Sequence, residues 1–219
     1  MLLGNQLLTR VARIWQHRER IEREAAALFE HHAGELAELG APAEVTRLAA
    51  RAADDEREHA RRCRALVERF HPGLPPLEPA PTQPLGPRHA SRASRALYAS
   101  VAMSCVTETL SAALLLHMRA RARDELVAET VHHILKDEID HSRLGWAHLA
   151  AAARRADVTW LAPHIAGMLR DAMATELEPM TSPDLSAYGI LTPAEVASIV
   201  DRTIATVIAP GLARFGIAA

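Results

Sequence analysis

The chain has 219 residues, which is enough for one sizeable hydrophobic core, and its 25 basic and 27 acidic residues nearly cancel to a net charge of -2. This balance excludes the strongly basic footprint of a nucleic-acid-binding protein. Aromatic residues make up only 4% of the chain and glycines number 10, a composition that favours a helical protein.

The N-terminal segment does not have the pattern of a secretory signal. Arg10 and Arg13 come too early in the chain for the apolar region of a signal peptide. No apolar run approaches the roughly 18 residues of a membrane span. The two cysteines, Cys63 and Cys105, form neither a CxxC motif nor a disulfide framework. We therefore expect a cytoplasmic protein that binds neither nucleic acid nor a membrane.

Two helical patterns come first in the chain, at about residues 5–39 and 43–69. Between them, Gly40 suits the position just after a helix, and Pro42 suits the first turn of the next one. A connection this short predicts that the two helices form a hairpin, residues 5–69.

Seven prolines follow in the stretch FHPGLPPLEPAPTQPLGP. Because neither a helix nor an interior strand can run through so many prolines, residues 70–90 are predicted to be an extended crossover. Two further helical patterns come next, at about 91–122 and 125–154, with Asp124 as the N-cap of the second. They predict a second hairpin, residues 91–154.

Residues 155–219 carry two more helical patterns. A shorter one follows Asp157 to about Ala174, and the last runs from Thr192 toward Ile208, where Pro210 and Gly211 are expected to close it. Two hairpins joined by a long crossover predict an all-α four-helix bundle of the kind that carries metals in its core. The C-terminal helices are expected to pack on its outside.

A short motif, Glu-x-x-His, occurs more often than chance predicts. The 18 Glu and 12 His of this chain give about one such pair by chance, so a single copy would mean little. Three copies lie wholly within the predicted helices, Glu56/His59, Glu129/His132 and Glu138/His141, while a fourth, Glu68/His71, runs into the Pro-rich stretch.

The helix face separates these pairs, because positions seven apart lie on one face of a helix in a bundle. The neighbours at this spacing are Ala49, Cys63 and Phe70 for Glu56, and Val131 and Gly145 for Glu138. Both pairs are therefore predicted to point into the core. Glu129 shares its line with Lys136 and Arg143, so we interpret its pair as solvated.

The two inward pairs lie 82 residues apart in the similar stretches DEREH and DEIDH, which indicates that the hairpin is repeated. A repeat predicts that the first helix of each hairpin supplies a matching carboxylate. Glu108 is the only acid of its helix. In the first hairpin, Glu22 shares its line with Trp15 and Phe29 and is preferred, while the loop lengths favour Glu24, which stays as the alternative.

The predicted metal ligands are Glu22, Glu56, His59, Glu108, Glu138 and His141. Four inward carboxylates without compensation would cost several kcal/mol each, whereas two divalent cations would cancel their charge. Carboxylates with one imidazole per ion suit iron or manganese, since a structural zinc site would more usually contain Cys. Asp55 and Asp137 are expected either to accept the Nδ1 hydrogen of a ligating His across the bundle or to be surface charges.

One Glu from each of two helices, together with Glu-x-x-His from each of the other two, resembles the ferritin-like di-iron carboxylate proteins. The resemblance covers about residues 10–150 and fills all six ligand positions. The stretches FEHHAGELAELGAP, DDEREHARRC and DEIDHSRLGWA are also similar to small bacterial ferritin-like proteins. This resemblance implies one ferritin-like domain over residues 1–219 with two bound iron ions, or manganese in their place.

The resemblance further implies a non-haem di-iron oxidase or oxygenase, with O2 as co-substrate, a small organic molecule as substrate and an electron donor as a further partner. Two alternatives stay open: an iron-handling ferroxidase whose substrate is Fe(II), and a metal-stabilised structural bundle. The small residues Ala25, Ala52, Ala112 and Gly145 fit either room for a substrate or close helix packing. The apolar faces of the last two helices fit either a homodimer or a cover over the bundle.

The remaining histidines receive separate interpretations. His148 lies seven residues after His141 and is expected to be a packing residue, or else to reach the outer shell of the metal or a substrate. His31, His32, His132 and His133 are expected to be solvated.

Overall fold

The three-dimensional structure is a computed structural model that describes residues 2–174, 181–182 and 185–218. Every secondary-structure element of that part of the chain is a helix, so the all-α prediction is confirmed. In chain order the elements are α1 Leu2–Glu38, α2 Ala43–Phe70, α3 Arg92–Ser100, the π-helix η1 Val101–Glu108, α4 Thr109–Arg121, α5 Glu125–Ala153, the 3-10 turn η2 Thr159–Leu161, α6 Ala162–Ala172, the 3-10 turn η5 Ser186–Tyr188, α7 Pro193–Thr203, the π-helix η6 Ile204–Ile208 and α8 Ala209–Ala213.

The first two helices form the predicted hairpin. Gly40 ends α1 in a left-handed conformation with φ +65°, which a glycine adopts without steric cost. The amide of Ala41 donates to the carbonyl of Leu36 at 3.0 Å and so satisfies one of the last free carbonyls of α1. Pro42 is the N-cap of α2, one position before the first turn in which it was expected.

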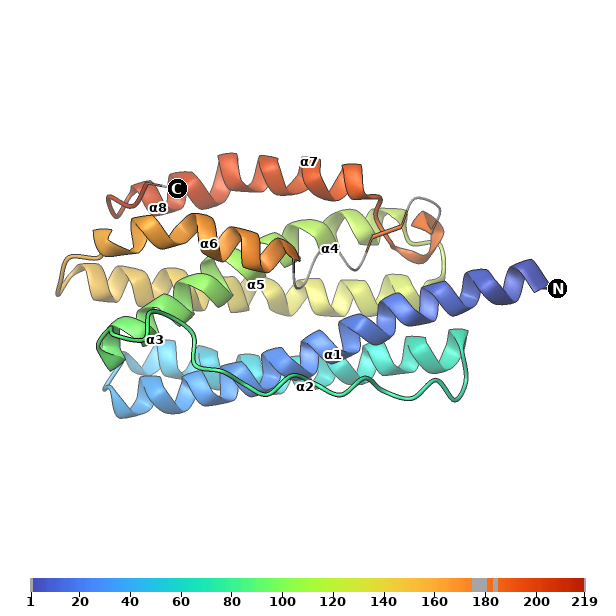
Figure 1. Ribbon diagram of the computed structural model, residues 1–219, viewed down its shortest axis with the longest axis horizontal. Coiled ribbons are helices and arrows are strands. Elements are labelled where there is room, and N and C mark those ends of the chain that lie inside the picture. Colours follow the sequence, from blue (N-terminus) through green and yellow to red (C-terminus); the bar gives the residue numbers. More distant parts are fainter. Residues whose placement is uncertain (1, 175–180, 183–184, 219) are drawn as a thin grey trace.

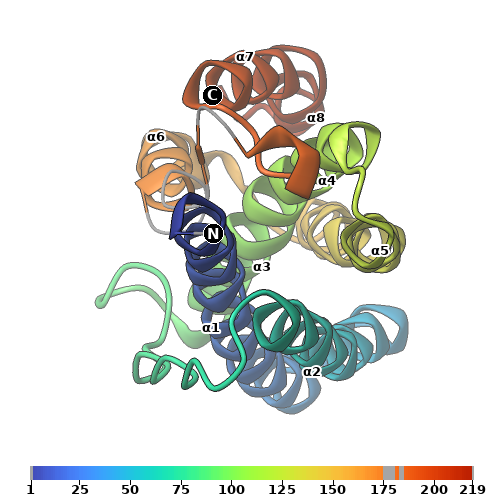
Figure 2. The same ribbon diagram turned by 90° about the vertical axis from the view of Figure 1, so that its right-hand side faces the viewer.

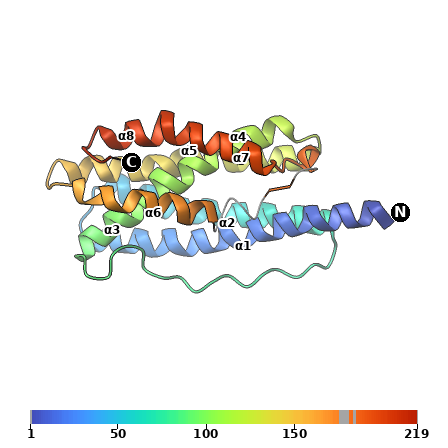
Figure 3. The same ribbon diagram turned by 45° about the horizontal axis from the view of Figure 1, so that its top comes forward.

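The Pro-rich crossover has no helix and runs alongside α1 (Figure 3). Hydrogen bonds tie it to that helix: Gln16 Nε2 donates to the carbonyl of Pro75 at 2.5 Å, and the amide of Ala80 donates to Glu24 Oε1 at 2.6 Å. The crossover therefore covers the outer side of α1.

The second hairpin contains a feature that the sequence did not predict. Instead of one continuous α-helix over about 91–122, the chain forms α3, then the π-helix η1, then α4. The predicted N-cap of α5 is confirmed, because the Asp124 side chain accepts hydrogen bonds from the amides of Leu126 and Val127 at 3.1 and 3.2 Å.

The helices pack in layers (Figure 1). The hairpin of α1 and α2 packs through α2 on α5, and α5 packs on η1 and α4. Viewed along the helices, α1 and α2 form one side of the molecule, and α7 and α8 lie on the opposite side (Figure 2). In that outer layer α7 contacts α4, and α6 contacts η1.

The two C-terminal helical segments begin where the sequence predicted. The first follows Asp157, whose carboxylate accepts the amide hydrogen of Thr159 at 2.9 Å, and η2 starts at Thr159. The last begins as predicted with Thr192, which forms a capping box with Glu195. Pro210 and Gly211 do not close it.

The chain continues helically through Pro210 as far as Ala213. Proline has no N–H to donate and its ring crowds the preceding turn of an α-helix. The chain forms π-helical turns over Ile204–Ile208, directly before this proline, and so departs locally from the α-helical hydrogen-bond pattern that proline disrupts.

Two helical stretches, Arg92–Arg121 and Pro193–Ala213, are long and apolar enough to cross a membrane by length and composition, so the expectation that no such run exists is wrong. In the first stretch 72% of the apolar window is buried inside the protein, as in the core helix of a soluble protein. In the second stretch 33% of the window is buried.

Gly145 marks a close approach between α5 and the first helix of the second hairpin. A Cβ atom at this position would lie 2.6 Å from the carbonyl oxygen of Ser100, 2.7 Å from the sulfur of Cys105 and 2.8 Å from its amide nitrogen. These distances are shorter than any van der Waals contact, and two of the three atoms belong to the backbone. Close packing is therefore the role of Gly145, one of the two roles that its sequence allowed.

Replacing Gly145 by Ala is expected to lower the free energy of unfolding by about 1–3 kcal/mol, because the backbone of η1 must move away from α5. The matched control is Gly34→Ala in α1, where an added Cβ meets no atom within 4 Å and helix propensity alone adds up to about 1 kcal/mol. Urea denaturation of the metal-free protein measures the free energy of unfolding of both variants. A Gly145→Ala variant as stable as the Gly34→Ala variant would contradict the close approach.

Candidate metal centre

The structure brings all six predicted ligand residues together in the core. They form two overlapping groups, each with one ligand atom per residue within 4.8 Å of the others. One group contains Glu22, Glu56, His59 and Glu138, and the other contains Glu56, Glu108, Glu138 and His141. All six side chains are buried, and the two groups share Glu56 and Glu138. This buried cluster could hold metal ions.

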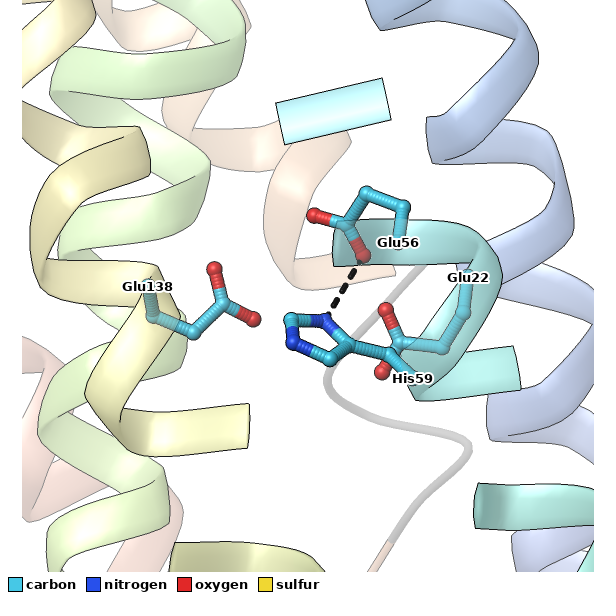
Figure 4. A group of neighbouring side chains, drawn as sticks. All are labelled: Glu22, Glu56, His59 and Glu138. Atoms are coloured by element: carbon cyan, nitrogen blue, oxygen red, sulfur yellow. Dashed lines mark hydrogen bonds and ion pairs between the residues drawn. The ribbon is translucent and has the colours of Figure 1, made fainter. Parts of the chain in front are cut away.

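The first group comes from three helices, as Figure 4 shows. Glu22 extends from α1, Glu56 and His59 from α2, and Glu138 from α5, and the four side chains point toward one another. His59 Nδ1 lies 3.1 Å from Glu56 Oε2. The i, i+3 spacing of this pair places both side chains on one face of α2, as the sequence predicted.

The second group mirrors this arrangement. His141 Nδ1 lies 3.2 Å from Glu138 Oε2 of its own helix and 3.0 Å from Glu56 Oε1 of α2. Glu108 enters from the last residue of the π-helix η1. The rings of His59 and His141 lie 5.7 Å apart between their centroids. Each histidine therefore directs Nδ1 toward the carboxylates that the two groups share.

The two aspartates interact with the histidines across the helices. His59 Nε2 of α2 lies 3.4 Å from Asp137 Oδ2 of α5, and His141 Nε2 of α5 lies 3.4 Å from Asp55 Oδ2 of α2. The expected pairing between helices is present, but the nitrogen is Nε2, and the prediction of Nδ1 is wrong. The half-exposed Arg51 lies beside both aspartates, 3.3 Å from Asp55 and 3.8 Å from Asp137.

The sequence analysis missed a buried arginine next to the cluster. The side chain of Arg18 is 6% exposed, and its Nε donates to Glu22 Oε1 at 2.7 Å. Its terminal nitrogen lies 3.4 Å from Ser111 Oγ, which in turn donates to Glu138 Oε1 at 3.2 Å. Its position in the sequence was a signal of burial, because Ala25 comes seven residues later and lies on the same face of the helix. Arg18 gives the cluster one fixed positive charge.

Without a metal, the cluster is a set of competing charges. Burial raises the pKa of Glu22 to about 8, and burial with a nearby carboxylate raises the pKa of Glu108 well above its usual range. Burial lowers the pKa of His59, but the hydrogen bond and charge of Glu56 outweigh it and raise the value to about 9. Burial raises the pKa of Glu56, yet hydrogen bonds from His141 and His59 hold it well below its usual range. Protons therefore occupy positions that divalent cations would take over.

The donor atoms fit iron or manganese. Carboxylate oxygens and imidazole nitrogens suit these ions, whereas thiolates favour zinc and copper(I). Cys63 lies one turn beyond His59, but burial raises the pKa of its thiol well above the usual value, so the sulfur stays protonated. It belongs to the buried core, as does Cys105.

The remaining candidates lie outside the cluster. Glu24, the alternative to Glu22, pairs with Arg20 at 2.5 Å and accepts the amide of Ala80, so its carboxylate holds the crossover. Glu129 and His132 are exposed, which confirms the interpretation of that pair as solvated. His32, which was expected to be solvated, is buried.

Comparisons with protein-family models, with curated proteins and with solved structures found no match for this chain. The resemblance to ferritin-like proteins therefore rests on the six residues and on the arrangement of the four helical segments that supply them.

The metal-free protein is expected to lose stability as the pH rises from about 6 to 9. The pKa values of Glu22 and His59 are about 8 and 9 in the folded chain against 4.5 and 6.5 ordinarily, so in this range the folded state retains protons that the unfolded state has lost. The urea midpoint measured in a chelator should fall accordingly. Saturating Mn(II), which replaces the protons, should flatten the dependence, and a midpoint that rises in the chelator would contradict the account.

Proposed function

We propose that this chain is a ferritin-like di-iron protein, a four-helix bundle that uses O2 to oxidise or oxygenate a small organic substrate. The observation that carries the proposal is the pair of overlapping ligand groups, which share Glu56 and Glu138 in the core. Two cations side by side would share carboxylates in this way, and carboxylate-rich bundle sites of this composition hold two iron or manganese ions. We further propose that the protein acts in the cytoplasm.

The residues of the chain have separable roles in this proposal. Glu22 and Glu108 each belong to one group only, so each would complete one ion. Asp55 and Asp137 orient the imidazoles through Nε2, and Arg18 keeps Glu22 in place. Two bound ferrous ions would supply two of the electrons that reduction of O2 needs, and the substrate or an electron donor would supply the others.

A cavity beside Glu108 supports an organic substrate. It measures about 150 Å³ and lies between α1 and η1, lined by Ala25, Phe29, Met103 and Thr107 among others. Ala25 is one of the small residues that the sequence singled out as room for a substrate. Phe29 also packs against the ligand histidine, with its ring centroid 5.6 Å from that of His141. A molecule in this cavity would lie directly against a metal-ligand carboxylate.

A second cavity of about 220 Å³ adjoins the first. Leu28, Met103 and Thr107 line both cavities, and Leu85 of the crossover and Met168 of α6 line the second. These mostly apolar walls favour a small apolar substrate that enters between the crossover and α6.

The chain is expected to bind two Fe(II) or Mn(II) ions, and Glu108→Ala at most one, because Glu108 belongs to only one ligand group. Glu129→Ala is the matched control, since it removes a carboxylate of the same type from an exposed helix face and should leave two ions bound. Equilibrium dialysis with metal analysis gives the stoichiometry. Two ions bound by the Glu108→Ala variant, or one by the unmodified chain, would contradict the di-metal proposal.

The oxidase or oxygenase role is tested by anaerobic Fe(II) loading followed by O2. We expect oxidation to stop at about two Fe(III) per chain, with further O2 uptake only when a reductant is added. Ferric iron that accumulates in proportion to the Fe(II) supplied would instead identify an iron-handling ferroxidase. Two bound ions that do not consume O2 would favour a metal-stabilised structural bundle.

A further inference from the structure

A further cavity lies at the end of the molecule away from the candidate metal centre. It has a volume of about 420 Å³, within the range of small-molecule sites. The turn between α1 and α2, the start of α3, the end of α5 and the segment before α6 enclose it. Leu36, Leu97, Val158 and Trp160 give it apolar walls.

A buried chain of polar side chains ends at this cavity. His148 of α5 lines it, and His148 Nδ1 lies 2.7 Å from Ser100 Oγ, which lies 2.7 Å from His32 Nε2. Ser100 is fully buried and His32 is 2% exposed. Two buried polar groups joined to a half-buried one are costly compared with apolar packing, so they call for a role beyond filling space.

The direction of the hydrogen bonds between His32, Ser100 and His148 determines which ring nitrogen of His148 carries a hydrogen. Burial lowers the pKa of His32 to about 3 and that of His148 to about 4, so both rings are neutral and each carries a single N–H. His32 Nδ1 is buried and has no hydrogen-bond partner among the residues described. A buried N–H without an acceptor is rarer than a bare lone pair, so His32 carries its hydrogen on Nε2 and donates to Ser100. Ser100 then donates to His148 Nδ1, which leaves His148 Nε2 with the N–H.

The rim of the cavity carries a positively charged side chain. Arg155 lines the cavity and is exposed, and within the described part of the chain no carboxylate pairs with it. The other charged lining residue, Asp157, already accepts the backbone amide and the hydroxyl of Thr159, both at 2.9 Å. One free guanidinium and one imidazole N–H beside apolar walls match a ligand with an acceptor at one end.

We propose that this cavity is a second binding site, for a small carboxylic acid with an apolar body whose carboxylate meets Arg155 and His148. The site is separate from the metal centre, since its residues belong to neither ligand group. It does not depend on the di-iron proposal.

Isothermal titration calorimetry with octanoate and 1-octanol tests this site on the full chain in a chelator. Octanoate is expected to bind at one molecule per chain, and Arg155→Gln to weaken it about tenfold without changing 1-octanol, which has no charge to lose. Arg154→Gln is the matched control, an exposed neighbour that is not among the cavity residues, and should change neither ligand.

The buried chain is tested by Ser100→Ala, which frees His148 from its hydrogen-bond partner and should weaken both ligands severalfold. Ser104→Ala removes an equally buried hydroxyl of the same helical segment that has no partner among the described residues, and should leave both affinities unchanged. Circular dichroism verifies that each variant folds. The proposal is overturned if octanoate shows no saturable binding, or if either variant behaves like its control.

Discussion

Four carboxylates buried in two overlapping groups are the constraint on which this structure depends. Glu22, Glu56, Glu108 and Glu138 repel one another, and burial removes the water that would screen them. Arg18 and the two histidines supply compensating charge, and protons on the carboxyl groups supply the remainder when no cation is present. Such a cluster could hold divalent cations in place of those protons.

The backbone around the cluster is shaped to bring these groups together. The π-helix η1 ends at Glu108, and Gly145 lets α5 approach the same helical segment at backbone contact distance. π-Helical turns are frequent at functional sites. The crossover is fixed to α1 through Gln16 and Glu24, and its Leu85 lines the second of the two cavities described beside the cluster. The departure from α-helical geometry at η1 thus coincides with Glu108, a residue that carries the proposed chemistry.

The sequence predicted the helices and the six cluster residues because hydrophobic periodicity records which face of a helix is buried. It did not predict η1, since the choice between α- and π-turns depends on packing against α5 rather than on local propensity. Arg18 and His32 look like surface residues one by one, yet both lie on the helix line of Ala25 and are buried. The choice of Nε2 for the aspartates depends on side-chain rotamers, which spacing does not determine.

The most direct test of the central claim is anomalous X-ray scattering at the iron absorption edge from crystals grown with Fe(II) under anaerobic conditions. The account predicts two anomalous peaks, one surrounded by Glu22, Glu56, His59 and Glu138, the other by Glu56, Glu108, Glu138 and His141. A single peak in the core, or iron bound only by exposed carboxylates with Glu56 and Glu138 still joined to the histidines, would contradict it.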